Sequence, residues 1–252
     1  MDRLSEECWN VESTSCSEPS TFNPQPSTLS ISVIIPTLNE ASRIAGLIAA
    51  TRQVGECEII VVDGGSTDGT LERATLADIV LASEPGRAKQ QNEGAATSRG
   101  DVLLFLHADC QLSVGAFEAI RAALQDERTV GGCFQQRIEA EGWAYRWLER
   151  GNAWRVRWLG LAYGDQGIFI RRAIFEQLGR FPDVKLMEDV LLMKRLHRRG
   201  RFVLLHERLS VSARRWQRHG IVRQTLRNWL LLILATCGVS PNCLARFYPH
   251  TR

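Results

Sequence analysis

Short apolar runs alternate with amphipathic segments along the first half of the chain. The runs, rich in β-branched residues, occupy positions 31–35, 59–62, 79–81 and 102–106. Between them lie segments with helical periodicity, such as 41–52 and 87–97. Continuous apolar strands separated by amphipathic helices are typical of a parallel sheet that is covered on both faces. We therefore predict an α/β fold with a mostly parallel central sheet flanked by helices.

The two ends of the chain differ from this pattern. Residues 1–30 are rich in Ser, Thr, Pro and Glu and show no apolar period, which predicts a disordered N-terminal tail. Residues 31–252 contain no linker, so we expect one domain there. Its final part, about residues 214–237, is a basic stretch followed by an apolar one. This predicts a helical segment that either packs as a last core helix or touches a membrane surface.

The sequence predicts no membrane-spanning helix and a cytoplasmic location. The longest apolar run, residues 229–235, has seven residues, whereas a spanning helix needs about 18 or more. The N-terminus lacks the basic and then apolar segments of a signal peptide. Seven cysteines without a CxxC motif suit reduced thiols better than a disulfide framework or a zinc site. We expect at most peripheral contact with the inner face of a membrane.

Composition and charge limit both the class of protein and the kinds of partner that we expect. With 44% hydrophobic and 23% charged residues, the chain of 252 residues is an ordinary globular protein and neither fibrous nor disulfide-dependent. The net charge of +3 is uneven, because residues 195–252 hold twelve arginines and one acidic residue. Arginine favours bidentate contact with phosphate or carboxylate, which suggests an anionic partner. A solvated helical surface explains the same charges equally well.

Polar segments follow each of the four predicted strands. They are PTLNE from residue 36, DGGSTDGT from 63, SEPGRAK from 83 and HADC from 107. The carboxyl ends of parallel strands meet at one edge of the sheet, where ligands of such folds bind. Four loops that converge on that edge predict a binding cleft.

Several acidic residues of these loops suit catalysis or ligand binding. Asp63 either accepts a hydrogen bond from a ribose hydroxyl or base N–H, or caps its own turn. His107 and Asp109, two residues apart, point the same way and can share a divalent cation, although a structural role is open. Glu188 and Asp189 open an amphipathic segment, where they either interact with the helix dipole or supply a general base.

Read together, these segments resemble the family 2 glycosyltransferases. The matching pieces, in family order, are ISVIIPTLNE, EIIVVDGGSTDGT, GRAKQQNEGA, GDVLLFLHAD, GDQGIFIRR and GRFPDVKLMED. The resemblance covers residues 31 to about 216, and its nearest likeness is to a bacterial subfamily associated with arsenosugar biosynthesis. It implies a Rossmann-like nucleotide-diphospho-sugar transferase fold of GT-A type. It also implies an inverting transfer from a nucleotide sugar, with a UDP-sugar favoured as the donor.

The resemblance extends to individual residues. Asp189 matches the catalytic base, preceded by Glu188 in the same acidic pair. Asp109 matches the last acid of a metal motif for Mn²⁺ or Mg²⁺, with His107 beside it. The acceptor side is assigned to Asp165 and Gln166. The expected nucleotide-sugar site consists of Pro36, Thr37, Asn39, Glu40, Asp63, Gly65, Arg87, Arg215 and Trp216.

Two positions depart from the family pattern. Gly64 stands where the family usually has a second aspartate, which removes one expected nucleotide contact. His107 replaces the first acid of the metal motif. Because imidazole suits manganese better than magnesium, this replacement predicts a softer metal preference or a looser dependence on metal.

Two rival functions remain open. A nucleotidyltransferase shares the fold type, but it typically has a glycine- and arginine-rich loop after the first strand, where this chain has PTLNE. A catalytically idle protein of this fold would instead use the basic C-terminal part to bind anionic lipid or another partner. For the transferase, we expect a nucleotide-sugar donor, an unidentified acceptor that is small or lipid-linked, and no nucleic-acid partner.

Overall fold

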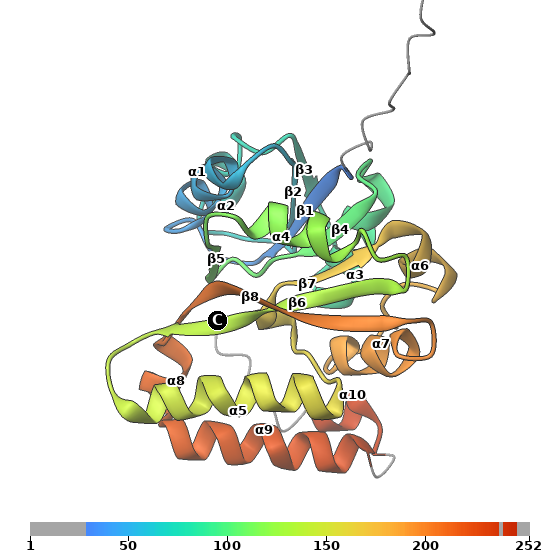
Figure 1. Ribbon diagram of the computed structural model, residues 1–252. Helices are drawn as coiled ribbons and strands as arrows, with labels where there is room; N and C mark the ends of the chain where they lie inside the picture. The colour runs from blue at the N-terminus through green and yellow to red at the C-terminus, as the bar shows by residue number, and fades with distance from the viewer. Residues whose placement is uncertain (1–28, 237–238, 246–252) are drawn as a thin grey trace, which may run out of the picture.

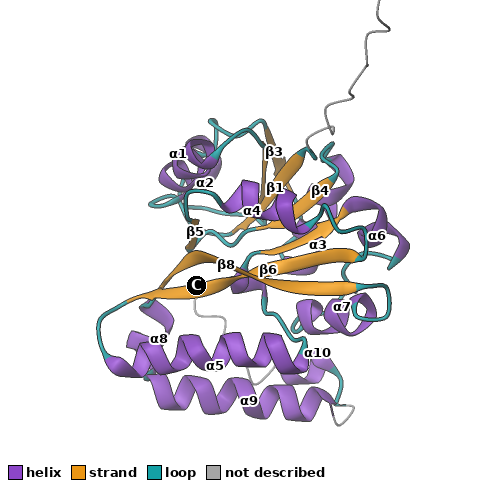
Figure 2. Ribbon diagram, viewed as in Figure 1, coloured by secondary structure: helices purple, strands orange, loops and turns teal. Residues whose placement is uncertain are grey.

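The structure is a computed structural model that describes residues 29–236 and 239–245 (Figure 1). The predicted disordered tail lies outside these residues except for Leu29 and Ser30. Eight strands form one sheet in the order β3-β2-β1-β4-β7-β6-β8-β5. Helices cover both faces of this sheet, and α5 and α9 lie together at one end of the molecule (Figure 2). The predicted α/β fold with a single central sheet is confirmed.

The strands are β1 Ile31–Thr37, β2 Glu58–Asp63, β3 Ile79–Ala82, β4 Val102–Phe105, β5 Cys110–Leu112, β6 Thr129–Glu139, β7 Ile168–Arg171 and β8 Arg201–Ser212. The helices are α1 Ile44–Val54, α2 Thr70–Arg73, α3 Arg87–Thr97, α4 Ala116–Ala123, α5 Trp143–Leu159, α6 Arg172–Gln177, α7 Glu188–Leu196, α8 Arg214–His219, α9 Ile221–Thr236 and α10 Pro241–Leu244. A short 3-10 helix, η1, spans Gly164–Gln166.

The four predicted strands are neighbours in the sheet. Strand β1 pairs in parallel with β2 and β4, and β2 pairs in parallel with β3. The second half of the sheet is mixed, because β7 runs antiparallel to β4 and β6, and β5 runs antiparallel to β8. Strands β6 and β8 are again parallel. The sheet is therefore mostly parallel, as predicted.

The apolar runs are continuous because both faces of the sheet are buried. On β1, Val33 and Ile35 belong to one core, which they share with α1 and α4. Ile34 points to the opposite core, which contains residues of α3, α6 and α7. Strand β6 approaches β7 closely at Gly132, where a Cβ atom would lie 2.4 Å from the ring of Phe169.

Gln90 of α3 fixes the carboxyl ends of β1 and β2. Its side-chain amide donates hydrogen bonds to the carbonyl oxygens of Thr37 and Val62, at 2.8 Å each. The side chain is 3% exposed. A Cβ atom at Gly64 would lie 3.0 Å from the Gln90 Nε2 atom, so glycine at this position leaves room for the amide. The missing second aspartate thus has a packing reason.

We predict that Gln90→Ala lowers the free energy of unfolding by about 2–3 kcal/mol, because two buried carbonyl groups lose their donor. Urea denaturation followed by circular dichroism measures this change. Lys89→Ala is the control: its side chain forms a surface ion pair with Glu84 of the loop before α3, and we expect the stability to stay close to that of wild type. Equal stabilities of the two variants would contradict the assignment.

Candidate active site

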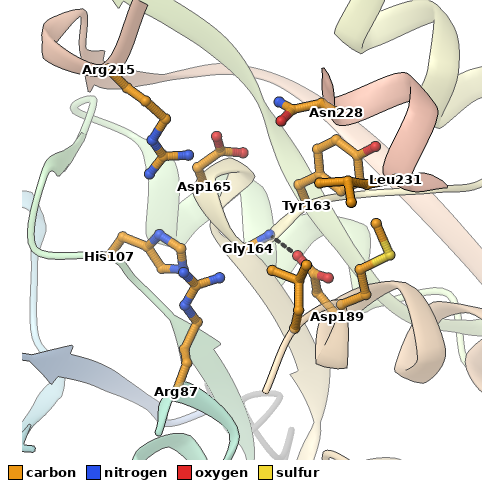
Figure 3. Close-up of a pocket in the computed structure, with 11 residues that line it drawn as sticks. Arg87, His107, Tyr163, Gly164, Asp165, Asp189, Arg215, Asn228 and Leu231 are labelled. Carbon is orange, nitrogen blue, oxygen red and sulfur yellow. Dashed lines mark hydrogen bonds between the residues drawn. The ribbon is translucent and has the colours of Figure 1, made fainter. Parts of the chain in front are cut away.

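A cavity opens at the carboxyl edge of the sheet, between the loops after β3 and β4, the segment before β7, and helices α7, α8 and α9. In Figure 3, Arg215, His107 and Arg87 line one side of it, and Asp189, Asn228 and Leu231 lie toward the other. Its lining consists of Arg87, His107, Tyr163, Gly164, Asp165, Leu186, Met187, Asp189, Arg215, Asn228 and Leu231. The cavity is therefore cationic on one side, with a carboxylate on the other.

Asp189 is held at the start of α7 with its carboxylate in the cavity wall. Its Oδ2 atom accepts a hydrogen bond of 2.8 Å from the Gly164 amide, and Oδ1 accepts one of 2.7 Å from the Val190 amide. Burial raises the pKa of Asp189 to about 6, and the neighbouring Glu188 carboxylate adds to the shift against the opposing charge of Arg87. A carboxylate with this pKa takes up a proton readily near neutral pH.

The Glu188 carboxylate contacts a different residue from those that bind the Asp189 carboxylate. Its Oε1 atom lies 3.2 Å from the Arg87 Nη1 atom, and the carboxylate is almost fully buried. The pair joins the first residue of α3 to the first residue of α7. The sequence placed Glu188 among the catalytic residues; in the structure its carboxylate orients the Arg87 guanidinium at the cavity wall.

The segment before β7 is organised by Arg155, which the sequence did not single out. The Arg155 side chain is 4% exposed and lies 3.7 Å from the ring centroid of Tyr163. It also donates to Gln166 Oε1 at 2.8 Å, and the same oxygen accepts the Tyr163 amide at 3.1 Å. Gln166 was expected on the acceptor side. In the structure its carboxamide is buried in this network and holds the loop.

Gly164 and Asp165 bring this loop into the cavity. A Cβ atom at Gly164 would lie 2.6 Å from His107 Nε2, so only glycine lets the loop pass between His107 and Asp189. Asp165 lines the cavity. Burial raises the pKa of Asp165, while Arg215 opposes the shift.

His107 and Asp109 lie in the loop that follows β4. His107 is 5% exposed and lines the cavity, and Asp109 is partly buried. Among the described residues, no group of three His, Cys, Asp or Glu side chains is placed to hold a metal ion. The predicted ligands are thus one imidazole and one carboxylate. Such a pair suits a divalent cation whose other positions are taken by phosphate oxygens and water.

The expected nucleotide loops lie beside the cavity, at the ends of β1 and β2. The Asp63 carboxylate accepts hydrogen bonds from the amides of Gly65 and Ser66, at 3.0 and 2.7 Å, and from the hydroxyls of Ser66 and Thr37. Of the two roles open to Asp63, the structure shows the turn-capping one. Gly65 is exposed and has φ = 92°, so its backbone is accessible.

The first loop is tied both to the second loop and to α8. The Asn39 amide donates to Ser66 Oγ at 2.7 Å, and Asn39 Oδ1 accepts the Thr67 amide at 3.0 Å. Glu40 Oε2 lies 3.9 Å from Arg214 Nη2. Pro36 is buried within β1.

Trp216 and Arg215 follow Arg214 but have different environments. Trp216 was expected at the donor site. Its side chain is 6% exposed and packs in the hydrophobic core, and it does not belong to the cavity lining, whereas Arg215 does.

Helix α9 contributes two cavity residues that the sequence did not indicate. Asn228 and Leu231 line the cavity, and the buried Gln224 donates to Asn228 Oδ1 at 3.0 Å. The only available signal was the helical spacing of these three residues, which places them on one side of α9. The expected last core helix is therefore also a wall of the site.

We predict that Asp189→Asn changes the pH dependence of stability. The pKa of about 6 in the folded protein lies above the ordinary pKa of an aspartate, about 3.9, so the native state binds the proton more tightly than the unfolded chain. The wild-type free energy of unfolding therefore falls by about 3 kcal/mol as pH rises from about 4 to about 7, and the variant escapes this loss. Urea denaturation of both proteins at several pH values measures the difference.

Asp183→Asn is the matched control, since Asp183 is an exposed carboxylate six residues before Asp189. It should leave the pH profile of the wild type unchanged. A constant difference in stability between wild type and Asp189→Asn across this pH range would refute the buried, protonatable state of Asp189.

The sheet, the cavity at its carboxyl edge and the acidic start of α7 define a nucleotide-sugar transferase fold of GT-A type. Residues 32–179 match the family model for glycosyl transferase family 2. The chain therefore belongs to glycosyltransferase family 2, as the sequence resemblance implied.

A similar protein of known sequence is also named as a glycosyltransferase. The chain is 27% identical over 216 residues to the probable glycosyltransferase YdaM of Bacillus subtilis (strain 168), which covers 74% of this chain and 50% of that protein. The chain thus spans half the length of this relative.

Two solved structures share the fold. S. aureus TarS in complex with UDP-GlcNAc matches with a TM-score of 0.59 at 19% identity, over 73% of this chain and 58% of that one. Glucosyl-3-phosphoglycerate synthase from Mycobacterium tuberculosis, in complex with Mn²⁺, UDP and glucosyl-3-phosphoglycerate, matches with a TM-score of 0.59 at 21% identity. That match covers 84% of this chain and 81% of the synthase.

Proposed function

We propose that this chain is an inverting glycosyltransferase that moves a sugar from a UDP-sugar to a hydroxyl-bearing acceptor, with Asp189 as the base. The observation that carries the proposal is the buried Asp189 carboxylate, with its raised pKa, in the same cavity as the guanidinium groups of Arg87 and Arg215. Inverting transfer needs these two features, a base on the acceptor side and positive charge on the leaving side. The uridine nucleotides bound by the two similar structures support the choice of donor.

The reaction is a single displacement at the anomeric carbon. The acceptor oxygen forms the new bond as the bond between that carbon and the diphosphate breaks. Asp189 takes the acceptor proton, which requires its ionised form and therefore a pH above about 6. Arg87 and Arg215 stabilise the charge that builds on the departing diphosphate. Glu188 keeps the Arg87 guanidinium in place through their contact of 3.2 Å.

The loops after β1 and β2 would hold the nucleoside. Pro36 and Thr37 end β1, and Asn39 and Glu40 follow it. The open backbone at Gly65 allows close approach. Asp63 would act by shaping this loop, because its carboxylate already accepts hydrogen bonds from Thr37, Gly65 and Ser66. Trp216 would support Arg215 from the core.

Asp109 and His107 would hold a divalent cation, Mn²⁺ or Mg²⁺. When bound, the ion would neutralise the diphosphate and make it a better leaving group. One imidazole and one carboxylate favour manganese over magnesium. The Mn²⁺ in the similar synthase structure supports this choice.

We also propose that α9 contacts a membrane surface, which is one of the two roles that the sequence left open for residues 214–237. Within the described part of the chain, no helix is both long and apolar enough to cross a bilayer. Helix α9 nevertheless leaves the side chains of Leu226 and Leu230 64% and 57% exposed. The acceptor is then either small or lipid-linked. The link to arsenosugar biosynthesis stays a prediction from the sequence resemblance.

We predict that Asp189→Asn reduces transfer by at least about 100-fold while donor affinity stays nearly unchanged, because the variant keeps the shape of the cavity but cannot accept a proton. Release of UDP from UDP-sugars in the presence of candidate acceptors measures the rate, and calorimetric titration with UDP measures affinity. Asp183→Asn, on the same segment but outside the cavity lining, should behave like wild type. If Asp189→Asn kept more than a tenth of the wild-type rate, another group would be the base.

A second prediction concerns the metal. Asp109→Ala should abolish the metal-dependent part of UDP binding, because the carboxylate ligand is lost. His107→Asp should shift the preference from Mn²⁺ toward Mg²⁺, because a carboxylate oxygen replaces nitrogen. Calorimetric titrations of UDP with each metal measure both effects. An unaltered metal preference in His107→Asp would remove His107 from the coordination sphere.

A further inference from the structure

Tryptophan is distributed unevenly over this molecule. The chain has seven tryptophans, and five of them lie on α5 and α9. All five side chains are exposed, by 78% at Trp143, 64% at Trp147, 54% at Trp154, 73% at Trp158 and 39% at Trp229. Large aromatic side chains gathered on one exposed surface are characteristic of a binding surface.

The exposed apolar residues of each helix form one stripe. The tryptophans of α5 are spaced four, seven and four residues apart, which places them on one side of the helix. On α9, Val222, Leu226, Trp229, Leu230 and Ile233 are exposed with the same periodicity. We call these ten residues, with Leu159 of α5 included, the tryptophan platform: Trp143, Trp147, Trp154, Trp158, Leu159, Val222, Leu226, Trp229, Leu230 and Ile233.

The two stripes form one continuous surface. Helices α5 and α9 lie side by side at the end of the molecule farthest from β1 to β4 (Figure 1). Trp147 of α5 and Val222, Leu226 and Trp229 of α9 line a common groove between the helices. The platform is thus a single apolar surface contributed by segments about 80 residues apart in the chain.

The charges beside the platform are almost all positive. Helices α5 and α9 together carry six arginines, of which Arg155 is buried, and one glutamate, Glu149. Glu149 is neutralised by Arg146 at 2.7 Å. Arg150 and Arg157 are exposed next to the α5 tryptophans, and the Arg150 guanidinium lies 6.0 Å from the Trp147 ring centroid. Arg137 and Arg208 line a groove along α5 together with Arg150 and Arg157.

We propose that the tryptophan platform binds the surface of a bilayer that contains anionic lipids. Tryptophan prefers the interface between headgroups and acyl chains, and the flanking arginines match anionic headgroups. A second copy of the chain is a poorer occupant, because it would bring an identical cationic rim against this one.

The platform includes the side of α9 that faces away from the catalytic cavity. Asn228 and Leu231 of α9 line the cavity, whereas Leu226, Leu230 and Ile233 of the same helix face outward. If the proposed function holds, docking therefore places the acceptor side of the site next to the bilayer. The docking itself does not depend on catalysis and can be measured separately.

The test is co-sedimentation of the full chain with vesicles of phosphatidylcholine alone and with added phosphatidylglycerol. We expect binding to the anionic vesicles that weakens at high salt. The double variant Trp147→Ser/Trp158→Ser should bind at least about tenfold more weakly, because two interfacial anchors are lost. The double variant Arg150→Gln/Arg157→Gln should bind about 30-fold more weakly at low salt, because two charges are removed.

The matched control is Leu76→Ser/Val114→Ser. These two apolar side chains are 59% and 88% exposed but lie outside the platform, so vesicle binding should equal that of wild type. Circular dichroism and a thermal shift on adding UDP confirm that each variant is folded and binds donor. If the wild type bound UDP but no vesicles, the platform would be overturned and the proposed transfer reaction would remain intact.

Two further outcomes would overturn the proposal. One is equal binding of the tryptophan variant and wild type to anionic vesicles. The other is a wild-type dimer in light scattering that becomes a monomer in Trp147→Ser/Trp158→Ser, since a second copy of the chain would then occupy the platform.

Discussion

The hydrogen bond from the Gly164 amide to the Asp189 carboxylate joins the two halves of the site. It connects the loop before β7 to the start of α7, at 2.8 Å. This hydrogen bond only partly compensates for the burial of the carboxylate, since burial still raises the pKa of Asp189 to about 6. Ionised Asp189 therefore destabilises the fold at neutral pH, and the surrounding core must offset this effect. A buried acid that is only partly compensated is typical of catalytic sites, where a residue can be kept for its basicity although it lowers the stability of the fold.

The neighbours of this bond are arranged around it by packing. Gly164 has no side chain, so His107 can approach the loop from the opposite side. Arg155 stacks on Tyr163 and holds Gln166, which keeps the loop rigid beneath the bond. Glu188 takes the adjacent position on α7 and directs Arg87 toward the cavity. A base, a cation and an imidazole thus share one small cavity because three loops meet at the same sheet edge.

The sequence predicted those features that depend on local pattern. The four apolar runs became β1 to β4, and the segment 87–97 became α3 with the same bounds. His107, Arg87 and Arg215 lie together because the segments after the mutually parallel strands β3, β4 and β8 meet at one edge. The start of α7 brings Asp189 to the same cavity. Other features depend on contacts between distant residues, which no local pattern contains. Gly64 can be understood only beside Gln90, and Trp216 belongs to a core that it shares with residues distant in the sequence.

Helix α9 is the clearest case in which the local sequence pattern was not enough to predict the structure. Its sequence allowed either a core helix or a surface helix, and the structure combines both roles on opposite sides of one helix. Gln224 and Leu231 are buried toward the domain, while Leu226 and Leu230 remain exposed. The inner side closes the cavity and cannot change without disturbing the site. The outer side has no such constraint from packing, yet it stays apolar and continues onto the tryptophans of α5. An apolar surface that folding does not require needs another reason, and a bilayer next to the acceptor side supplies one.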